Sequence, residues 1–203
     1  MNTNKFLTML AISGTLFISS CSDDDDNPDP ANEGELITTM TVTLTNSTDT
    51  SDTVVMRFFD EDGENGPTEP TPTVTGTLKA STTYNGSVAV LNESEDPVEI
   101  VTEEIQEEAD EHQFFFITDD LGITTAYTDN ESNYENAEGV AFTSTNPVGL
   151  TFTLTTTDTT GDVALRVVLR HELDKDASGV AEGNIANAGG SPDIDWTFNT
   201  SVE

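Results

Sequence analysis

The sequence predicts an all-β protein: an antiparallel β-sandwich of the immunoglobulin or fibronectin type III kind, with one short acidic helix near residues 102–111. Three observations predict this fold class. Apolar and polar residues alternate along many segments, turn-forming residues separate these segments, and a single stretch has a helical composition. Alternation with a period of two marks strands that bury one face, and threonine suits the face left in solvent. Many short strands separated by turns are typical of sandwiches.

Four segments alternate most clearly. In residues 36–45, Met40, Val42 and Leu44 fall on one face and threonines on the other. The same pattern recurs in residues 148–155, 163–173 and 193–200. Weaker candidate strands cover residues 53–60, 74–79, 84–92, 113–118, 123–128 and 140–143, and the turn signals include Asp62-Gly63, Asn85-Gly86 and Asn146-Pro147.

Residues 102–111 carry helix-forming side chains in place of an alternating pattern. Ile105 and Ala109 lie four residues apart and would share one face of a helix. Thr102 is placed to cap the first turn, where acidic side chains also suit the helix dipole. We therefore expect a short helix that begins at Thr102.

Leu78, Thr82 and Tyr84 follow the spacing Leu-x-x-x-Thr-x-Tyr. This spacing resembles the tyrosine corner of fibronectin type III-like sandwiches, in which a Tyr hydroxyl bonds back to the backbone near the start of a strand. Ala80 stands where that motif usually has proline. The resemblance predicts that Tyr84 ties the preceding loop to its own strand.

The first 20 residues have the pattern of a cleaved signal peptide. Lys5 supplies a positive charge, and the largely apolar stretch 6–18 follows it. That stretch is shorter than the roughly 20 residues that a membrane-spanning helix needs. The small residues before Cys21, the only cysteine, resemble a relaxed lipobox, so we expect Cys21 to be the lipid-bearing first residue of the mature chain. A secretory signal that ends at an ordinary cleavage site is the alternative.

An acidic run follows the cysteine directly and consists of Ser22, Asp23, Asp24, Asp25 and Asp26. Its position resembles the export signal that sends some Gram-negative lipoproteins to the outer face of the outer membrane. A solvated spacer is the simpler interpretation, and both can hold at once. We accordingly expect residues 21–34 to be a lipidated, acidic, disordered linker and residues 35–203 to be a single β-sandwich domain.

The charge of the chain excludes one class of partner. The sequence carries 6 Lys and Arg against 39 Asp and Glu, a net charge of −33, and loss of Lys5 with the signal peptide makes it −34. Binding to nucleic acid needs a basic surface, so nucleic acid is not expected as a partner. Repulsion from anionic membranes leaves the lipid as the expected membrane attachment. The sequence has no Gly-x-Ser-x-Gly elbow and no phosphate-binding glycine loop, so we do not expect an enzyme.

The two histidines are candidates for a metal site. His112 begins a strand face that carries phenylalanines, and His171 ends a face of valines and leucines. If those strands are neighbours, the imidazoles can meet, and two histidines with a carboxylate can coordinate Zn²⁺. The alternative is a pair of histidines at the edge of the core, hydrogen-bonded to backbone, because no short spacing such as His-x-x-x-His links them. The acids that flank the histidines are Glu108, Glu111, Glu172 and Asp174, of which Glu111 and Glu172 are directly adjacent.

Two acidic loops are candidates for binding Ca²⁺, which prefers oxygen ligands. The first is residues 60–66, with Asp60, Asp62 and Glu64 as candidate ligands, although its glycine does not fit the EF-hand spacing. The second is residues 129–136. A solvated turn is the alternative for both. A divalent metal, zinc or calcium, is the only cofactor that the sequence suggests.

Four segments resemble a family of small surface lipoproteins that are labelled "type 1 periplasmic binding fold" proteins. They are Leu78–Gly86 (LKASTTYNG), Glu108–Phe116 (EADEHQFFF), Leu169–Glu172 (LRHE) and Gly183–Gly190 (GNIANAGG), and the resemblance extends over residues 33–203. The label implies two α/β lobes, whereas the pattern of this chain predicts strands with one helix. The resemblance implies a surface lipoprotein that acts beside an outer-membrane transporter. Together with the candidate histidine site, it leads us to expect a surface-exposed outer-membrane lipoprotein that binds a metal ion or small ligand. The alternative is a structural or adhesive lipoprotein that makes protein contacts only.

Overall fold

The computed structural model describes residues 36–61, 70–118 and 122–203. In these residues the chain forms nine β-strands, one α-helix and two short 3₁₀ helices. Their bounds in chain order are β1 (Thr39–Asn46), β2 (Thr53–Phe59), β3 (Thr71–Thr75), β4 (Thr83–Leu91), α1 (Val101–Glu107), β5 (His112–Thr118), β6 (Thr124–Tyr127), η1 (Glu131–Asn133), β7 (Thr151–Thr155), β8 (Gly161–His171), η2 (Ile185–Asn187) and β9 (Ser191–Val202).

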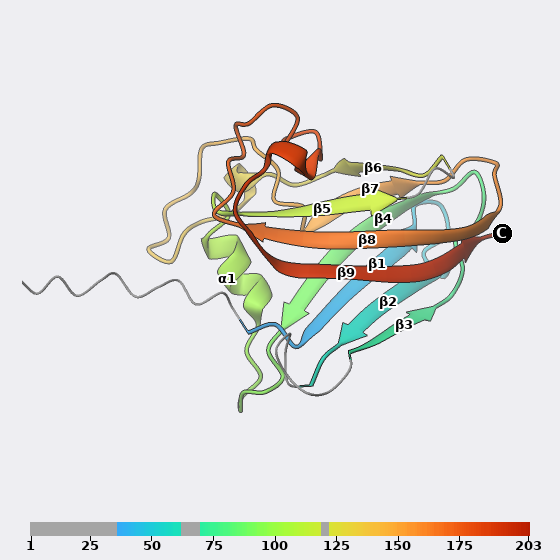
Figure 1. Cartoon of the computed structure of the whole chain (residues 1–203), viewed down its shortest axis with the longest axis horizontal. Helices are drawn as coiled ribbons and strands as arrows, with labels where there is room; N and C mark the ends of the chain where they lie inside the picture. Colours follow the sequence, from blue (N-terminus) through green and yellow to red (C-terminus); the bar gives the residue numbers. More distant parts are fainter. Residues whose placement is uncertain (1–35, 62–69, 119–121) are drawn as a thin grey trace, which may run out of the picture. The chain divides into compact units, whose positions relative to one another are not determined.

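The strands form two antiparallel sheets, which Figure 1 shows as two layers. One sheet has six strands in the order β3-β2-β1-β4-β7-β6, and the other has three in the order β5-β8-β9. The predicted all-β sandwich is therefore confirmed. The narrower assignment to the immunoglobulin or fibronectin type III kind stays a prediction.

The main core lies between the inner faces of the two sheets. In β1, Met40, Val42 and Leu44 are fully buried, whereas the threonines between them are partly exposed. Phe116 of β5 stacks on Phe152 of β7 with the ring centroids 3.8 Å apart, so an aromatic contact joins the two sheets. The alternation seen in the sequence is the direct result of this one-sided burial.

The three-stranded sheet is also covered on its outer face. Residues 172–190, between β8 and β9, place Leu173 and Val180 against Phe115 and Val168, which point away from the main core. Because both faces of β5 are covered, three consecutive phenylalanines can all be buried there. This coverage also brings the chain after His171 back over the same sheet.

The predicted strand at residues 74–79 is displaced toward the N-terminus. β3 ends at Thr75, and the next residue, Gly76, has a φ of +90°, which turns the chain away from the sheet. A Cβ at this position would lie 2.6 Å from the backbone oxygen of Thr53. Only glycine suits both the backbone conformation and the close approach.

The predicted strand at residues 140–143 is wrong. This segment makes a single isolated bridge, between Glu135 and Ala141, and joins no sheet. Its backbone bonds to an irregular loop instead, as when the Phe142 N–H donates to the Tyr134 oxygen at 3.2 Å. Residues 140–143 adopt this conformation because they bond to the loop around η1. The alternation within the segment gives no sign of that contact.

The helix α1 is present, but it is shorter than predicted and Thr102 does not cap it. Its N-cap is Ile100, which makes no side-chain capping hydrogen bond. The Thr102 hydroxyl instead accepts a hydrogen bond from the Val90 N–H at 2.7 Å and donates to the Val90 oxygen at 3.1 Å. Thr102, although its side chain could cap a helix, therefore joins α1 to β4 by hydrogen bonds.

The predicted tyrosine-corner contact is present. Tyr84 is fully buried in β4, and its hydroxyl oxygen accepts a hydrogen bond from the Lys79 N–H at 2.8 Å. This bond ties the loop after β3 to the first residues of β4. Burial raises the pKa of Tyr84, so the phenol stays neutral in ordinary buffers.

The predicted turn at Asn85-Gly86 lies inside β4 instead. Gly86 pairs with Phe152 of β7. A Cβ on Gly86 would lie 2.5 Å from Cζ of Phe152, so the aromatic ring occupies the space that a side chain would need. Glycine serves here to let a neighbouring ring approach the strand backbone.

We expect Gly86→Ala to lower the free energy of unfolding by about 1–3 kcal/mol, because the added methyl must displace the Phe152 ring in a packed core. Urea denaturation of the two proteins measures this loss. Ser87→Ala is the matched control, since Ser87 is the exposed next residue of the same strand. Equal stability of Gly86→Ala and the parent would contradict the proposed packing.

Candidate metal centre

The pairing of β5 with β8 places the two histidines directly opposite each other. His112 is the first residue of β5, His171 is the last residue of β8, and their Cα atoms are register partners. The imidazole rings stack with centroids 4.3 Å apart and planes inclined by 20°. Both side chains lie on the inner face of the sheet and are almost completely buried. The sequence prediction that they could meet is therefore confirmed.

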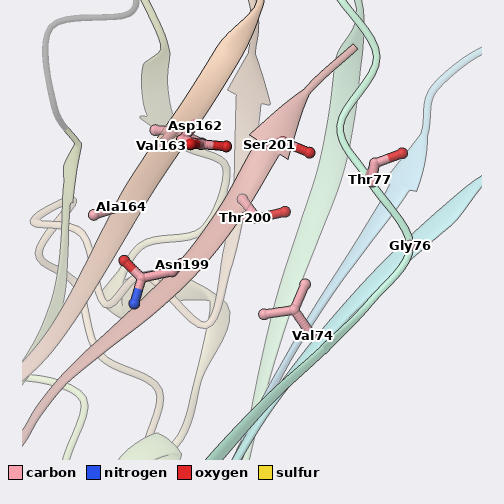
Figure 2. A pocket seen from close by; sticks show the side chains of 9 residues that line it. All are labelled: Val74, Gly76, Thr77, Asp162, Val163, Ala164, Asn199, Thr200 and Ser201. Carbon is pink, nitrogen blue, oxygen red and sulfur yellow. The ribbon is translucent and has the colours of Figure 1, made fainter.

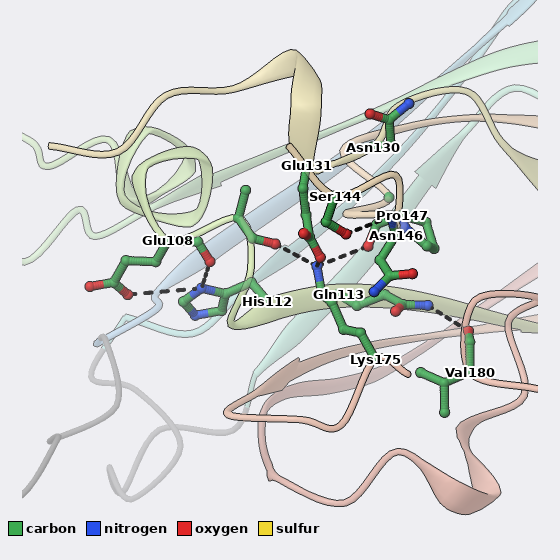
Figure 3. Close-up of polar contacts among 12 residues, drawn as sticks. Glu108, His112, Gln113, Asn130, Glu131, Ser144, Asn146, Pro147, Lys175 and Val180 are labelled. Atoms are coloured by element: carbon green, nitrogen blue, oxygen red, sulfur yellow. Dashed lines mark hydrogen bonds and ion pairs between the residues drawn. The ribbon is translucent and has the colours of Figure 1, made fainter. Parts of the chain in front are cut away.

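Each ring nitrogen of His112 faces an acidic residue. Nδ1 lies 3.2 Å from the backbone oxygen of Glu108 and 3.9 Å from its carboxylate. Figure 3 shows both contacts as dashed lines. Nε2 lies 3.9 Å from the carboxylate of Asp193. The two acids differ in burial, since the Glu108 side chain is 49% exposed and the Asp193 side chain only 5%. The ring thus has one side toward solvent and one toward the interior.

His171 completes two sets of residues that could hold a cation. Its Nε2 lies 3.4 Å from the carboxylate of Glu111, which is half exposed. In the first set, Glu108, His112 and His171 each offer a ligand atom within 4.8 Å of the others. In the second set, Glu111, His171 and Glu172 do the same. The two predicted acids, Glu111 and Glu172, therefore lie beside the histidine pair.

Asp193 reaches the centre through a β-bulge in β9. Leu169 of β8 pairs with Ile194, but the next residue, Arg170, pairs with Pro192, so Asp193 is the extra residue of the bulge. Without the extra residue, alternation would turn Asp193 to the opposite face from Ile194. A bulge re-aims a side chain in this way. The sequence reasoning missed Asp193, because period-two alternation gives no sign of a one-residue insertion.

The backbone beside His171 is held in an unusual conformation. Glu172 has a φ of +53°, in the left-handed region that non-glycine residues rarely adopt. Its N–H donates to the Glu111 oxygen at 2.9 Å, which joins the chain after β8 to the turn before β5. Opposite it, Gly190 lies so close that a Cβ there would be 2.2 Å from the His171 oxygen. These contacts determine the backbone conformation where β5 begins and β8 ends, next to the two histidines.

The donor set suits a borderline divalent cation. Imidazole nitrogens and carboxylate oxygens together are typical ligands of Zn²⁺, at bond lengths near 2.0–2.1 Å. Ligand atoms on one tetrahedral ion are then about 3.3 Å apart. The ligand atoms of each set lie within 4.8 Å of one another, so rotations of the stacked imidazoles as well as of the half-exposed glutamates must bring them to that spacing. Calcium, which takes oxygen ligands, is less suited to this pair of imidazoles.

A buried ion pair supports the turn that carries these residues. The Lys175 ammonium donates hydrogen bonds to the backbone oxygens of Ala109 and Pro147 and pairs with the Glu131 carboxylate at 3.1 Å, as Figure 3 shows. Both charged side chains are only 4% exposed. Burial lowers the pKa of Lys175, while attraction to Glu131 opposes that shift. Three acceptors match the three donors of the ammonium, so Lys175 is a structural cation rather than a nucleophile.

A second polar contact fixes β5 from the side of β6. The Tyr127 hydroxyl donates to the Phe114 oxygen at 2.7 Å and accepts from Gln113 Nε2 at 3.1 Å. Gln113 Nε2 also donates to the Val180 oxygen at 2.9 Å, which ties β5 to the covering segment. Burial raises the pKa of Tyr127 to about 12. The strand that begins with His112 is therefore held on both of its faces.

The first calcium prediction falls mostly outside the described residues. Asp62 and Glu64 lie in the part of the chain that the structure does not describe. Asp60 is described and is buried, with its N–H donating to the Thr38 oxygen at 2.8 Å. Calcium binding by Asp60, Asp62 and Glu64 stays a prediction.

The second acidic loop uses two of its acids, Asp129 and Glu131, in internal contacts. The two carboxylate oxygens of Asp129 accept hydrogen bonds from the Gly149 N–H at 2.8 Å, the Thr151 N–H at 3.1 Å and the Tyr134 hydroxyl at 2.7 Å. Glu131 pairs with Lys175, as described above. These contacts account for Asp129 and Glu131, two of the three acids of the loop, as parts of the fold, whereas the third, Glu135, is exposed. They favour the structural interpretation for these two acids.

A separate open groove lies at the far end of β8, with a volume of about 570 Å³. Figure 2 shows its lining side chains from the β3 end, from β8 and from β9. They are Val74, Gly76, Thr77, Asp162, Val163, Ala164, Asn199, Thr200 and Ser201. Asp162 is the second residue of β8 and His171 the last, so the groove and the histidine pair are distinct features about 30 Å apart along the strand.

The predicted anchor and export signal, Cys21 with residues 22–26, lie outside the described residues. In the described ranges, no helix is both long enough and apolar enough to cross a membrane.

Comparison with protein-family models, curated proteins and solved structures finds no match to this chain.

We expect Lys175→Met to lower the free energy of unfolding by about 3–5 kcal/mol, because it leaves the Glu131 carboxylate buried without its counter-charge. Urea denaturation measures the loss. The double variant Lys175→Met with Glu131→Leu removes both charges and should recover much of the stability. A single variant as stable as the parent would show that the ion pair does not hold the turn.

Proposed function

We propose that this protein is a surface-anchored lipoprotein that binds a divalent transition metal ion of the zinc type at the histidine pair. The observation that carries the proposal is the direct opposition of His112 and His171, the only histidines of the chain, with their rings 4.3 Å apart. Glu108, Glu111 and Glu172 surround them with carboxylates. Such a set of nitrogen and oxygen donors is more specific than an acidic cluster alone.

The access and charge of the site suit reversible binding of a cation. The imidazoles are buried, whereas Glu108 and Glu111 have half-exposed side chains that reach from solvent to the rings. The chain carries a net charge of −33, which concentrates divalent cations around the protein. A cation can thus meet the half-exposed carboxylates first and the buried imidazoles afterwards.

The location is proposed from the sequence. Cys21 and the acidic run behind it support lipid anchoring at the outer face of the outer membrane. A metal-binding protein at that surface would act beside an outer-membrane transporter, as the resemblance to small surface lipoproteins implies. The alternative, an adhesive or structural lipoprotein, would make protein contacts and bind no metal.

We expect the protein expressed without residues 1–21 to bind Zn²⁺ at micromolar concentration or below, as measured by calorimetric titration. His112→Ala and His171→Ala should each weaken binding by more than about tenfold, because each removes an imidazole donor. Zinc should also raise the melting temperature of the parent protein, since a ligand that binds only the folded state stabilises it.

Asp162→Asn is the control for the zinc experiment, because it removes a carboxylate at the opposite end of β8. It should bind zinc as tightly as the parent. Failure of the parent protein to bind at micromolar zinc would end the metal proposal and leave the adhesive alternative. Unchanged binding by both histidine variants would place the metal elsewhere in the chain.

We expect the mature N-terminus to be Cys21 with a thioether-linked diacylglycerol, because no disulfide partner exists for this cysteine. Mass spectrometry of the N-terminal peptide from cell envelopes measures this. Cys21→Ala should abolish acylation and release the protein from the membrane. An unacylated start at another residue would refute the proposed anchor.

A further inference from the structure

We propose that Asp193 is a positioning residue for the metal centre. The buried carboxylate of Asp193 holds the Nε2 side of His112, which leaves the lone pair of Nδ1 directed to the cation. This inference rests on the metal-binding function proposed above and assigns a ligand atom within it. It is carried by the two-sided environment of His112, by the burial of Asp193 and by the bulge that places Asp193.

The two sides of the His112 ring are not equivalent. Nδ1 faces Glu108, whose side chain is half exposed and belongs to the first ligand set with His171. Nε2 faces Asp193, whose side chain is 5% exposed. A cation that arrives from solvent meets the Nδ1 side, where the half-exposed Glu108 carboxylate is present. The Nε2 side is closed behind the ring.

A histidine that binds a metal through one nitrogen usually donates the hydrogen of the other to a carboxylate or a backbone oxygen. Asp193 is placed to be that acceptor, at 3.9 Å from Nε2, and a shift of about 1 Å brings it to hydrogen-bonding distance. An ionised carboxylate accepts such a hydrogen more strongly than a neutral group does. With the hydrogen on Nε2, the lone pair of the imidazole is on Nδ1 and points toward Glu108.

The backbone oxygen of Glu108 competes for the same ring. It lies 3.2 Å from Nδ1 and would accept a hydrogen carried there. A cation bound at Nδ1 takes the place of that hydrogen. The backbone oxygen and the carboxylate oxygen of Glu108 that face Nδ1 are then attracted to the cation, so neither stabilises the tautomer with hydrogen on Nδ1. Asp193 therefore favours the tautomer of His112 that has its hydrogen on Nε2 and can bind a metal through Nδ1. Metal binding at Nδ1 in turn excludes the other tautomer.

The bulge in β9 is the structural device that makes this arrangement possible. Asp193 is the extra residue of the bulge, between Pro192 and Ile194, and Asp195, two positions along the strand, points to solvent. Asp195 pairs there with Arg166, with 2.6 Å between Nε and Oδ1. Two aspartates on one strand thus have opposite environments, which provides a matched pair for an experiment.

The first measurement is zinc affinity by calorimetric titration of the parent protein, Asp193→Ala and Asp195→Ala. We expect Asp193→Ala to bind zinc about 10- to 100-fold more weakly, the usual effect of removing the carboxylate behind a metal-bound histidine. Asp195→Ala should bind as the parent does. Equal affinity of the parent and Asp193→Ala overturns the inference but leaves the metal-binding proposal intact.

The second measurement needs no variant and separates positioning from direct ligation. In ¹H–¹⁵N spectra of the zinc-loaded parent protein, we expect His112 to carry its hydrogen on Nε2 and the metal on Nδ1. Zinc on Nε2 would make Asp193 a ligand of the metal and overturn its positioning role. Absence of zinc binding by the parent protein overturns the function proposed above, and this inference fails with it.

Discussion

The antiparallel register between β5 and β8 is the constraint on which the proposed centre depends. It fixes His112 opposite His171, and a shift by one residue would turn one imidazole to the other face of the sheet. The register is held by burial on both faces. Phe114 and Phe116 pack into the main core, and Phe115 packs under the segment that follows β8. The phenylalanine run of β5 thereby locates a polar site at its end.

Three departures from regular strand geometry shape the corner around that site. A bulge turns Asp193 inward, Glu172 adopts a left-handed conformation, and Gly190 allows close backbone approach. Each costs stability on its own, and such features persist where the surrounding contacts determine them. Lys175 supplies one of these contacts by binding the backbone at Ala109. Backbone features of this kind often cluster at functional sites.

Two roles are found among the acidic side chains of the described residues. Some carboxylates belong to the fold, such as Asp129, which accepts hydrogen bonds from the backbone, and Glu131, which pairs with Lys175. Others, such as Glu108 and Glu111, stand half exposed over the imidazoles. Only the second group can rearrange around a cation without breaking these contacts of the fold, so Glu108 and Glu111 are the carboxylates that we propose as ligands.

The sequence by itself determined the class of fold and the candidate histidines, because one-sided burial imprints an alternation that is readable in segments such as residues 36–45. Position alone also marked Glu111 and Glu172 as neighbours of those histidines. The opposition of the two imidazoles, the bulge at Asp193 and the role of Thr102 were decided by the tertiary structure. Each of these depends on residues far apart in the chain, and strand order, register and a one-residue insertion leave no periodic trace that a single sequence can show.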